Sequence, residues 1–296
     1  MGERMSNRWL SAVVTYTALA VVALAFVLPL LWMLSVSLKP TREVLRPNLL
    51  PQHPTASAYR EVVGLGTEDP GKLRGDRRIE SGKFNYLLYA RNTLVIVVLS
   101  LVGMVLSSAI AAYGFARLEF PGRRALFAIC LATMMIPFPV LMVPTYMIFK
   151  YLGWIGTFRP LWVPAWFGSA FNIFLLRQFF LGIPKELEES AMLDGCSRWG
   201  CFWRIMLPLS KPALAVVALF HVLAVWNDLL GPLVYLSHQD EYTLALGLQF
   251  LQSRSGDTPW NELMAASALI ILPVLVLFVF AQRTFIRGIA TTGLKG

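Results

Sequence analysis

The chain has 296 residues, of which 56% are hydrophobic and 15% charged, and its mean hydropathy is +0.60. Soluble domains carry about 25% charged residues, and here the apolar residues lie in long charge-free intervals. This composition excludes a water-soluble core, a disordered or collagen-like chain, and a secreted disulfide scaffold. It indicates an integral membrane protein.

The charges and cysteines narrow the choice of partners. The net charge is +9, but the 26 Lys and Arg are dispersed along the connections between apolar runs. That pattern favours membrane lipid and an acidic protein partner, and we expect no nucleic acid. Cys130, Cys196 and Cys201 lack the spacing of a zinc or redox motif, so we expect neither a disulfide framework nor a metal site.

Six stretches are long and apolar enough to cross a membrane as helices, which needs about 20 residues each. They predict an all-α membrane protein with six transmembrane helices. The expected spans are about 10–37, 92–116, 125–149, 160–181, 212–236 and 263–282. The fourth is long enough only if Arg177 snorkels and the helix continues to Leu181. The first is longer than a signal-peptide core, so we predict a retained anchor.

Six spans place both termini on the same side of the membrane. Residues 1–296 then form a single transmembrane domain, with an outer segment at 38–91, an inner loop at 183–210 and an inner tail at 283–296. Lys and Arg fall in equal numbers on the two sides, so the positive-inside rule does not by itself orient the chain. The part of the outer segment at 54–83 follows no pattern that assigns it a role.

The sequence carries no catalytic signature. Gly66–Leu73 resembles a phosphate-binding loop, but Leu73 stands where Ser or Thr must bind magnesium. Glu68 and Asp69 would repel phosphates, so we expect a plain loop and no ATP hydrolysis by this chain. Neither a nucleophile turn nor paired carboxylates occur in or near the spans. The three histidines, which lack metal-ligand spacing, are His53, His221 and His238.

Two spans carry signals of helix shape. The second has a small-residue face that permits close helix contact, made of Ser107, Ser108, Ala111, Ala112, Gly114 and Ala116. The third contains three prolines, each of which removes a backbone donor, namely Pro137, Pro139 and Pro144. We expect tight packing of the second span and a kink in the third.

The fifth span contains Asn227 and Asp228 within an apolar run. An acid at a helix centre costs about 2.5–3.5 kcal/mol on insertion scales, so these residues should face protein or water. They could line a translocation path. Equally, they could form an interhelical hydrogen bond or lie near the membrane surface.

The inner loop predicts a helix–turn–helix elbow. Pro184 suits a first helical position, and Gly195 ends that helix. Three carboxylates complement the positive end of the first helix, namely Glu186, Glu188 and Glu189. Ser197 can cap a second helix, which stops before Pro208. An amphipathic elbow can lie on lipid, but the acidic first turn favours docking to a basic groove on a soluble partner.

This loop resembles the EAA loop of bacterial ABC importer permeases, whose pattern is E-A-A, three residues, G, nine residues, I-x-L-P. Ser190 in place of the first alanine is the one departure. The residues that carry the resemblance, with Ser190 at the departing position, are Glu189, Ser190, Ala191, Asp194, Gly195, Ile205, Leu207 and Pro208. The Trp226–Leu233 run and the ending from Gln282 are similar to carbohydrate-uptake permeases of the MalG type, over nearly the whole chain.

The resemblance implies a type I ABC importer in the bacterial inner membrane, with both termini cytoplasmic. A MalF-like permease would pair with this chain, two ATPase subunits would carry ATP and Mg, and an extracytoplasmic sugar-binding protein would deliver a di- or oligosaccharide. The chain itself would hold no cofactor and catalyse nothing. Alternating access would follow ATP-driven closure of the ATPase pair.

The resemblance also implies roles for particular segments. Glu189 would contact a basic group on the ATPase, Gly195 would allow the turn, and Phe202 and Ile205 would fill the groove. The tail at 287–296 would reach the ATPases, and the loop at 237–260 would meet the binding protein.

Three rival functions differ from this expectation. A permease for another solute, such as glycerol phosphate, would favour arginines in the cavity. An ion-driven secondary carrier should show two similar halves with coupling acids. A membrane-embedded enzyme would need a catalytic constellation, which the sequence lacks.

Overall fold

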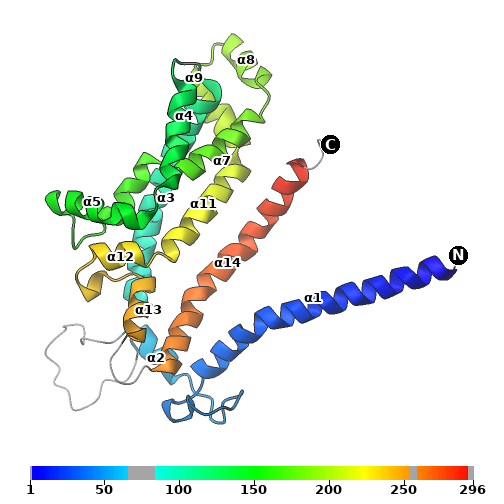
Figure 1. Ribbon diagram of the computed structural model, residues 1–296, viewed down its shortest axis with the longest axis vertical. Helices are drawn as coiled ribbons and strands as arrows, with labels where there is room; N and C mark the ends of the chain where they lie inside the picture. Colours follow the sequence, from blue (N-terminus) through cyan, green and yellow to red (C-terminus); the bar gives the residue numbers. More distant parts are fainter. Residues whose placement is uncertain (1, 66–83, 254–258, 293–296) are drawn as a thin grey trace. The chain divides into compact units, whose positions relative to one another are not determined.

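The computed structural model describes residues 2–65, 84–253 and 259–292, and every regular element in these ranges is helical (Figure 1). The predicted all-α class is confirmed. In chain order the α-helices are α1 (Gly2–Ser37), α2 (Ser57–Val63), α3 (Tyr86–Arg117), α4 (Arg123–Ala132), α5 (Phe138–Tyr151), α6 (Arg159–Trp162), α7 (Ala170–Leu181), α8 (Glu186–Leu193), α9 (Arg198–Cys201), α10 (Leu207–Leu209), α11 (Lys211–Trp226), α12 (Leu230–Tyr235), α13 (Leu244–Gln252) and α14 (Trp260–Thr292). The shorter helical turns are η1 (Thr41–Glu43), η2 (Thr133–Met135), η3 (Val163–Phe167), η4 (Phe202–Met206) and η5 (Gln239–Glu241), of which η4 is a π-helical turn.

Three single helices are long and apolar enough to cross a membrane, within α1, α3 and α14. Three further pairs of helices qualify if each bent pair counts as one span, with bends of 99°, 76° and 76°. The described residues thus provide up to six spans. The phosphate-loop-like segment Gly66–Leu73 and the last four residues of the tail lie outside the described residues.

The proline-rich third span is broken, as the prolines predict. Helix α4 with η2 ends at Met135, and α5 begins at Phe138 at an angle of 99° to it. Ile136 is extended, at φ −86° and ψ 112°, because the ring of Pro137 disfavours a helical conformation in the residue before it. The kink is therefore a complete interruption of the helix.

Helix α7 continues through Arg177 to Leu181, as the length of the fourth span requires. The Arg177 guanidinium lies 4.3 Å from the centre of the Phe127 ring, and its Nε donates to the carbonyl of Phe115 at 3.2 Å. Ring stacking and a carbonyl acceptor thus accommodate the charge within the protein.

Part of the small-residue face of α3 packs closely, as expected, whereas no atom of another element lies within 4 Å of a Cβ built at Gly114. Ser108, Ala112 and Ala116 are buried, and they let neighbouring helices approach. At Gly103 a Cβ atom would lie only 2.3 Å from the Trp166 ring, so only glycine fits there. The indole nitrogen of Trp166 donates to the carbonyl of Leu99 at 3.1 Å.

The chain divides into two compact units, residues 1–86 with 248–272 and residues 87–247 with 273–296. In the first unit, the Ser37 and Tyr59 hydroxyls lie 2.8 Å apart and connect the end of α1 to α2. Asn261 of α14 donates to the Thr41 hydroxyl at 3.5 Å. The second unit contains the inner loop and the helices that support it.

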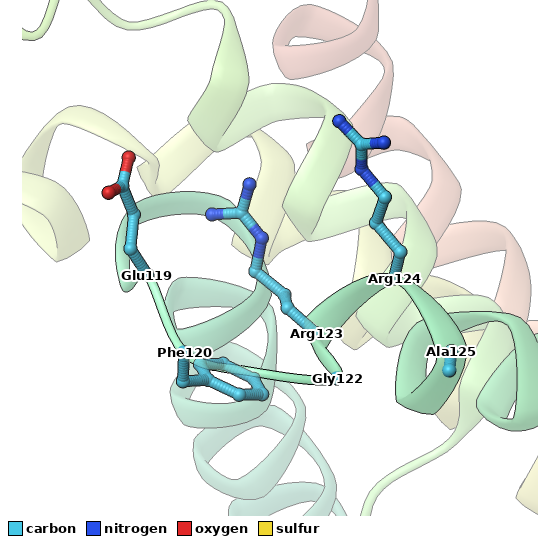
Figure 2. A pocket seen from close by; sticks show the side chains of 6 residues that line it. All are labelled: Glu119, Phe120, Gly122, Arg123, Arg124 and Ala125. Atoms are coloured by element: carbon cyan, nitrogen blue, oxygen red, sulfur yellow. The ribbon is translucent and has the colours of Figure 1, made fainter.

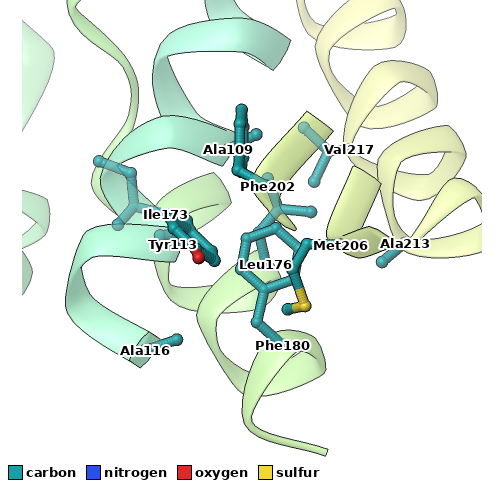
Figure 3. Close-up of a cluster of buried hydrophobic side chains, with 11 residues drawn as sticks. Ala109, Tyr113, Ala116, Ile173, Leu176, Phe180, Phe202, Met206, Ala213 and Val217 are labelled. Atoms are coloured by element: carbon teal, nitrogen blue, oxygen red, sulfur yellow. The ribbon is translucent and has the colours of Figure 1, made fainter. Parts of the chain in front are cut away.

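The core of the second unit combines four segments of the chain (Figure 3). It takes three alanines and a tyrosine from α3, large residues from α7 and η4, and an alanine and a valine from α11. The buried members are Ala109, Ala112, Tyr113, Ala116, Ile173, Leu176, Phe180, Phe202, Met206, Ala213 and Val217. Part of the inner loop therefore belongs to the hydrophobic core, which fixes the loop on the helix ends.

Candidate functional site

The first helix of the inner loop is α8, and its first turn is acidic, as predicted. It begins at Glu186 with Lys185 as the N-cap residue, so Pro184 lies just before the helix and not at its first position. Carboxylates near a helix N-terminus interact favourably with the unpaired backbone amides there. The three carboxylates do not share one environment, because Glu188 is buried whereas Glu186 and Glu189 are exposed.

Gly195 ends α8 as the sequence predicts. Its φ is +86°, in the left-handed region. The amide of Cys196 donates to the carbonyl of Ala191 at 2.9 Å, and that of Gly195 to Met192 at 3.1 Å. This pair of bonds is the Schellman arrangement, which favours glycine because a Cβ atom is strained at positive φ.

The second helix of the elbow begins as expected but does not end as expected. The Ser197 hydroxyl caps it by accepting a hydrogen bond from the Gly200 amide at 3.1 Å. The helical path then continues from α9 through η4 into α10, so it passes Pro208 and ends at Leu209. Pro208 lies in the first turn of α10, where a missing backbone donor is tolerated.

The residues of the EAA pattern divide between the core and the surface. Glu189, Ser190, Asp194, Gly195 and Pro208 are exposed. Three others are half-buried, namely Ala191, Ile205 and Leu207. The Ser190 hydroxyl donates to the carbonyl of Glu186, so the serine that replaces alanine satisfies its hydroxyl within α8.

Phe202 does not present its ring to a partner, contrary to the expectation that it fills a groove. It is fully buried, and its ring centre lies 5.1 Å from that of Tyr113 and 5.4 Å from that of Trp199. Packing in the core shown in Figure 3 removes the apolar ring of Phe202 from water, which stabilises this position. Phe202 thus anchors the loop to α3.

The exposed apolar residues of the loop are different from those that the sequence indicated. Leu193 is 89% exposed and Trp199 is 54% exposed. Trp203, at 44%, lies edge-on to Trp199 with ring centres 6.0 Å apart. Exposed large apolar groups of this kind mark surfaces for interaction. Helical periodicity could have indicated them, because Trp199 and Trp203 are four residues apart.

An ion pair that sequence reasoning missed connects the loop to the helix ends. Arg117 Nε, at the end of α3, lies 3.2 Å from Glu188 Oε1, and the side chains are 4% and 10% exposed. Burial raises the pKa of Glu188, whereas the charges of Arg117 and Arg198 lower it. The sequence signal was present, since an arginine ends a long apolar span, but its partner lies 71 residues away.

Asn227 and Asp228 lie at a break between helices. Helix α11 ends at Trp226 and α12 begins at Leu230, so the helical path of the expected 212–236 span is interrupted. Asn227 donates to the carbonyl of Leu223 at 2.8 Å, and Asp228 accepts from the Gly231 amide at 3.1 Å. Both side chains thus serve the helix ends, and a role in the translocation path stays a prediction.

A cavity of about 20 Å³ adjoins Asp228. Its lining is mixed, with two hydroxyls beside apolar groups, and comprises Thr93, Ile96, Leu161, Val225, Asp228, Pro232 and Thr243. A space of this size holds about one water molecule. It is too small for a sugar.

A hollow of about 490 Å³ lies at the turn between α3 and α4, and Figure 2 shows the side chains that line it. Arg123 donates to the carbonyl of Leu118 at 2.9 Å, whereas Arg124 is exposed. The lining is Glu119, Phe120, Gly122, Arg123, Arg124 and Ala125. The two guanidinium groups suit a surface beside anionic lipid headgroups, and that contact stays a prediction.

The described residues contain no group of three or more metal-ligating side chains that could hold an ion. His221, one of the three histidines, shares a hydrogen bond of 2.9 Å with the Ser100 hydroxyl. This histidine thus has a structural partner between helices.

Fold and loop together define a class, the multi-pass all-α membrane protein with an elbow set into the ends of its helices. The family model for the binding-protein-dependent transport system inner membrane component matches residues 103–291. The chain belongs to this family, and its resemblance to importer permeases is confirmed.

Relatives extend the similarity over nearly the whole chain. The arabinooligosaccharides transport system permease protein AraQ of Halalkalibacterium halodurans is 34% identical over 94% of each chain. The diacetylchitobiose uptake system permease protein DasC of Streptomyces coelicolor is 31% identical over 93% of this chain and 94% of its own. The galactooligosaccharides transport system permease protein GanQ of Bacillus subtilis is 29% identical, with full coverage of both.

A solved structure has the same fold. It is a chain of a bacterial ABC transporter involved in the import of the acidic polysaccharide alginate. The TM-score is 0.78 at 22% identity, over 93% of this chain and 96% of that one. The predicted type I importer permease fold is thereby confirmed.

Proposed function

We propose that the chain is the permease subunit of an ATP-driven importer of a di- or oligosaccharide. The observation that carries the proposal is the EAA-spaced elbow, which is set into the hydrophobic core by Phe202 and joined to α3 by Glu188. A loop anchored in this way can pass a displacement to the spans. A loop lying loosely on lipid could not.

The exposed surface of the elbow suits a protein partner. It combines the carboxylate of Glu189 with large apolar groups at Leu193 and Trp199. Apolar anchors rimmed by charge are typical of docking surfaces. We infer that a basic groove on an ATPase subunit receives this surface, and that ATP and Mg are bound on the ATPase subunits.

The assembly that we propose has five components. A MalF-like permease pairs with this chain, and two ATPase subunits dock on the cytoplasmic side, where both termini of this chain also lie. An extracytoplasmic binding protein delivers the sugar. ATP binding favours one state of the ATPase pair, and this difference in affinity drives alternating access.

The substrate class follows from the relatives, whose names specify arabinooligosaccharides, diacetylchitobiose and galactooligosaccharides. The sugars in these three names differ, but all of them are neutral oligosaccharides. We therefore favour this class over glycerol phosphate. An ion-driven carrier is disfavoured because Asp228, the acid of the fifth span, caps a helix.

The test is sugar-stimulated ATP hydrolysis by the complex in lipid, purified with its neighbouring gene products. Glu189→Ala removes the exposed carboxylate, and Gly195→Asp strains the turn at φ +86°. We expect both variants to lose sugar stimulation by about tenfold, the scale of a coupling energy of 1–3 kcal/mol. Glu119→Ala is the matched control, since this exposed carboxylate lies outside the loop.

The absence of a copurifying ATPase would contradict the proposal. So would hydrolysis that responds equally to sugar in wild type and both variants. An ion-driven carrier would then be tested by uptake against an imposed proton or sodium gradient.

A further inference from the structure

The end of α3 contacts the inner loop at two places. Arg117 Nη2 donates to the carbonyl of Phe180 at 2.8 Å and to that of Ile183 at 2.6 Å. One turn earlier, the Tyr113 hydroxyl donates to the carbonyl of Arg198 at 3.1 Å. Residues four apart share a helix face. One face of α3 therefore touches the loop both before α8 and after the Gly195 turn.

Arg117 also contacts α8, which is the coupling helix of the proposed function, through the buried pair with Glu188. Arg117 Nε and Glu188 Oε1 lie 3.2 Å apart as an ion pair, and within the described part of the chain neither atom has a partner in hydrogen-bonding geometry. The guanidinium thus joins two backbone carbonyls and one carboxylate. A lysine could not do this, because its single ammonium lacks the planar fork.

Helix α7 returns the same kind of contact to α3. Arg177 Nε donates to the carbonyl of Phe115 at 3.2 Å, while Arg117 donates to the last turn of α7. Each helix end is thus bonded by an arginine of the other. Such two-way bonding resists sliding of α3 along α7.

We propose that Arg117 is a positioning residue that clamps the coupling helix to α3 and α7 through Glu188, so that a displacement of the coupling helix moves these two spans. Without the clamp, the segment between Leu181 and Glu186 absorbs the displacement. The inference rests on the proposed function, because it assumes that an ATPase displaces α8.

The groups around Glu188 determine how the clamp responds to pH. The charged or titratable ones are Arg117 and Tyr113 from α3, with Arg198 and Cys201 from the second helix of the elbow. Protonation of Glu188 removes its attraction to Arg117. We therefore expect coupling to decline as the pH falls through the raised pKa of Glu188.

The experiment measures sugar transported per ATP hydrolysed by the full complex in lipid vesicles. Glu188→Gln is compared with Glu186→Gln, the same chemical change at an exposed position of the same helix. We expect Glu188→Gln to lower the transport ratio about fivefold or more and to abolish its pH dependence. The KM for ATP should stay unchanged, because α8 binds no nucleotide. Glu186→Gln removes an exposed charge of the acidic first turn but leaves the contact with Arg117, so it should keep the wild-type pH dependence of the transport ratio.

Two further variants keep the test decisive if Glu188→Gln assembles poorly. Glu188→Asp keeps the charge on a shorter side chain, and Arg117→Lys keeps the charge without the fork. We expect intermediate transport ratios that still depend on pH. A wild-type ratio in both variants would overturn the clamp, as would equal behaviour of Glu188→Gln and Glu186→Gln. Failure of the proposed function is separate, because wild-type hydrolysis would then ignore sugar.

Discussion

Two buried cations lie at the ends of long apolar helices of this protein. One stabilises a local loop and the other joins distant segments. Lys39 follows α1 and is 1% exposed, and its ammonium donates to the carbonyl of Asn48 at 2.5 Å. Arg117 ends α3 and bonds carbonyls and a carboxylate that lie 63 to 71 residues away. Lys39 thus folds the loop that directly follows it, whereas Arg117 joins separate elements.

The difference shows how charge is managed in each unit. The ammonium of Lys39 lies 5.4 Å from the centre of the Trp32 ring, and the contacts of its Nζ are this ring and two carbonyls, those of Arg46 and Asn48. The guanidinium of Arg117 has a counter-charge in Glu188. The first arrangement is local, since both carbonyls lie within nine residues of Lys39. The second can be broken by a proton or by the motion of α8.

The largest expected effect is that of Arg117→Met. It removes the guanidinium that lies 3.2 Å from the buried Glu188 carboxylate, and with it one donor to the carbonyls of Phe180 and Ile183. Breaking a buried pair in this way costs about 3–5 kcal/mol. Chemical unfolding of the purified chain in detergent measures the loss. The double variant Arg117→Met with Glu188→Leu should recover most of it, and a double variant as unstable as the single one would contradict the pair.

A smaller loss is expected for Lys39→Met. The substitution removes a buried charge along with its donor bonds, so the cost is that of unsatisfied carbonyls, about 1–3 kcal/mol. The same unfolding measurement applies, and no carboxylate is left unpaired. A loss equal to that of Arg117→Met would show that the local and the long-range cation have the same energetic role.

The smallest expected effect is a difference in pH dependence. Burial raises the pKa of Glu188 above its ordinary value of 4.5, so the folded chain holds this proton more tightly than the unfolded chain. Stability therefore falls as pH rises from 4.5 through the raised pKa. Thermal unfolding over this range should show that decline in wild type and in Glu186→Gln, but not in Glu188→Gln. An identical decline in all three would assign it to other groups.

Much of the fold could be predicted from local sequence. Proline at 137 broke the third span, Gly195 ended α8 and Ser197 capped α9, because each depends on backbone conformations that the residue itself favours. The EAA spacing also located the inner loop, since a motif of fixed spacing needs no knowledge of distant contacts.

Other features depended on distant contacts and could not be predicted. An apolar residue of a surface loop can face a partner or the chain's own core, and Phe202 faces the core because Tyr113 lies within reach. Similarly, an acid in an apolar run can line a path or cap a helix. Asp228 accepts a hydrogen bond from the Gly231 amide in the first turn of α12, which the break after Trp226 made possible. Its role in the translocation path stays a prediction.

Composition and apolar run length by themselves determined that this protein is an all-α membrane component, because membrane thickness and backbone bonding leave few alternatives. Motif spacing located its EAA-type inner loop. Which carboxylate of α8 faces solvent and which is buried was decided only by tertiary structure. Glu188 and Glu189 are neighbours of the same type. They differ because α3 brings Arg117 to one of them.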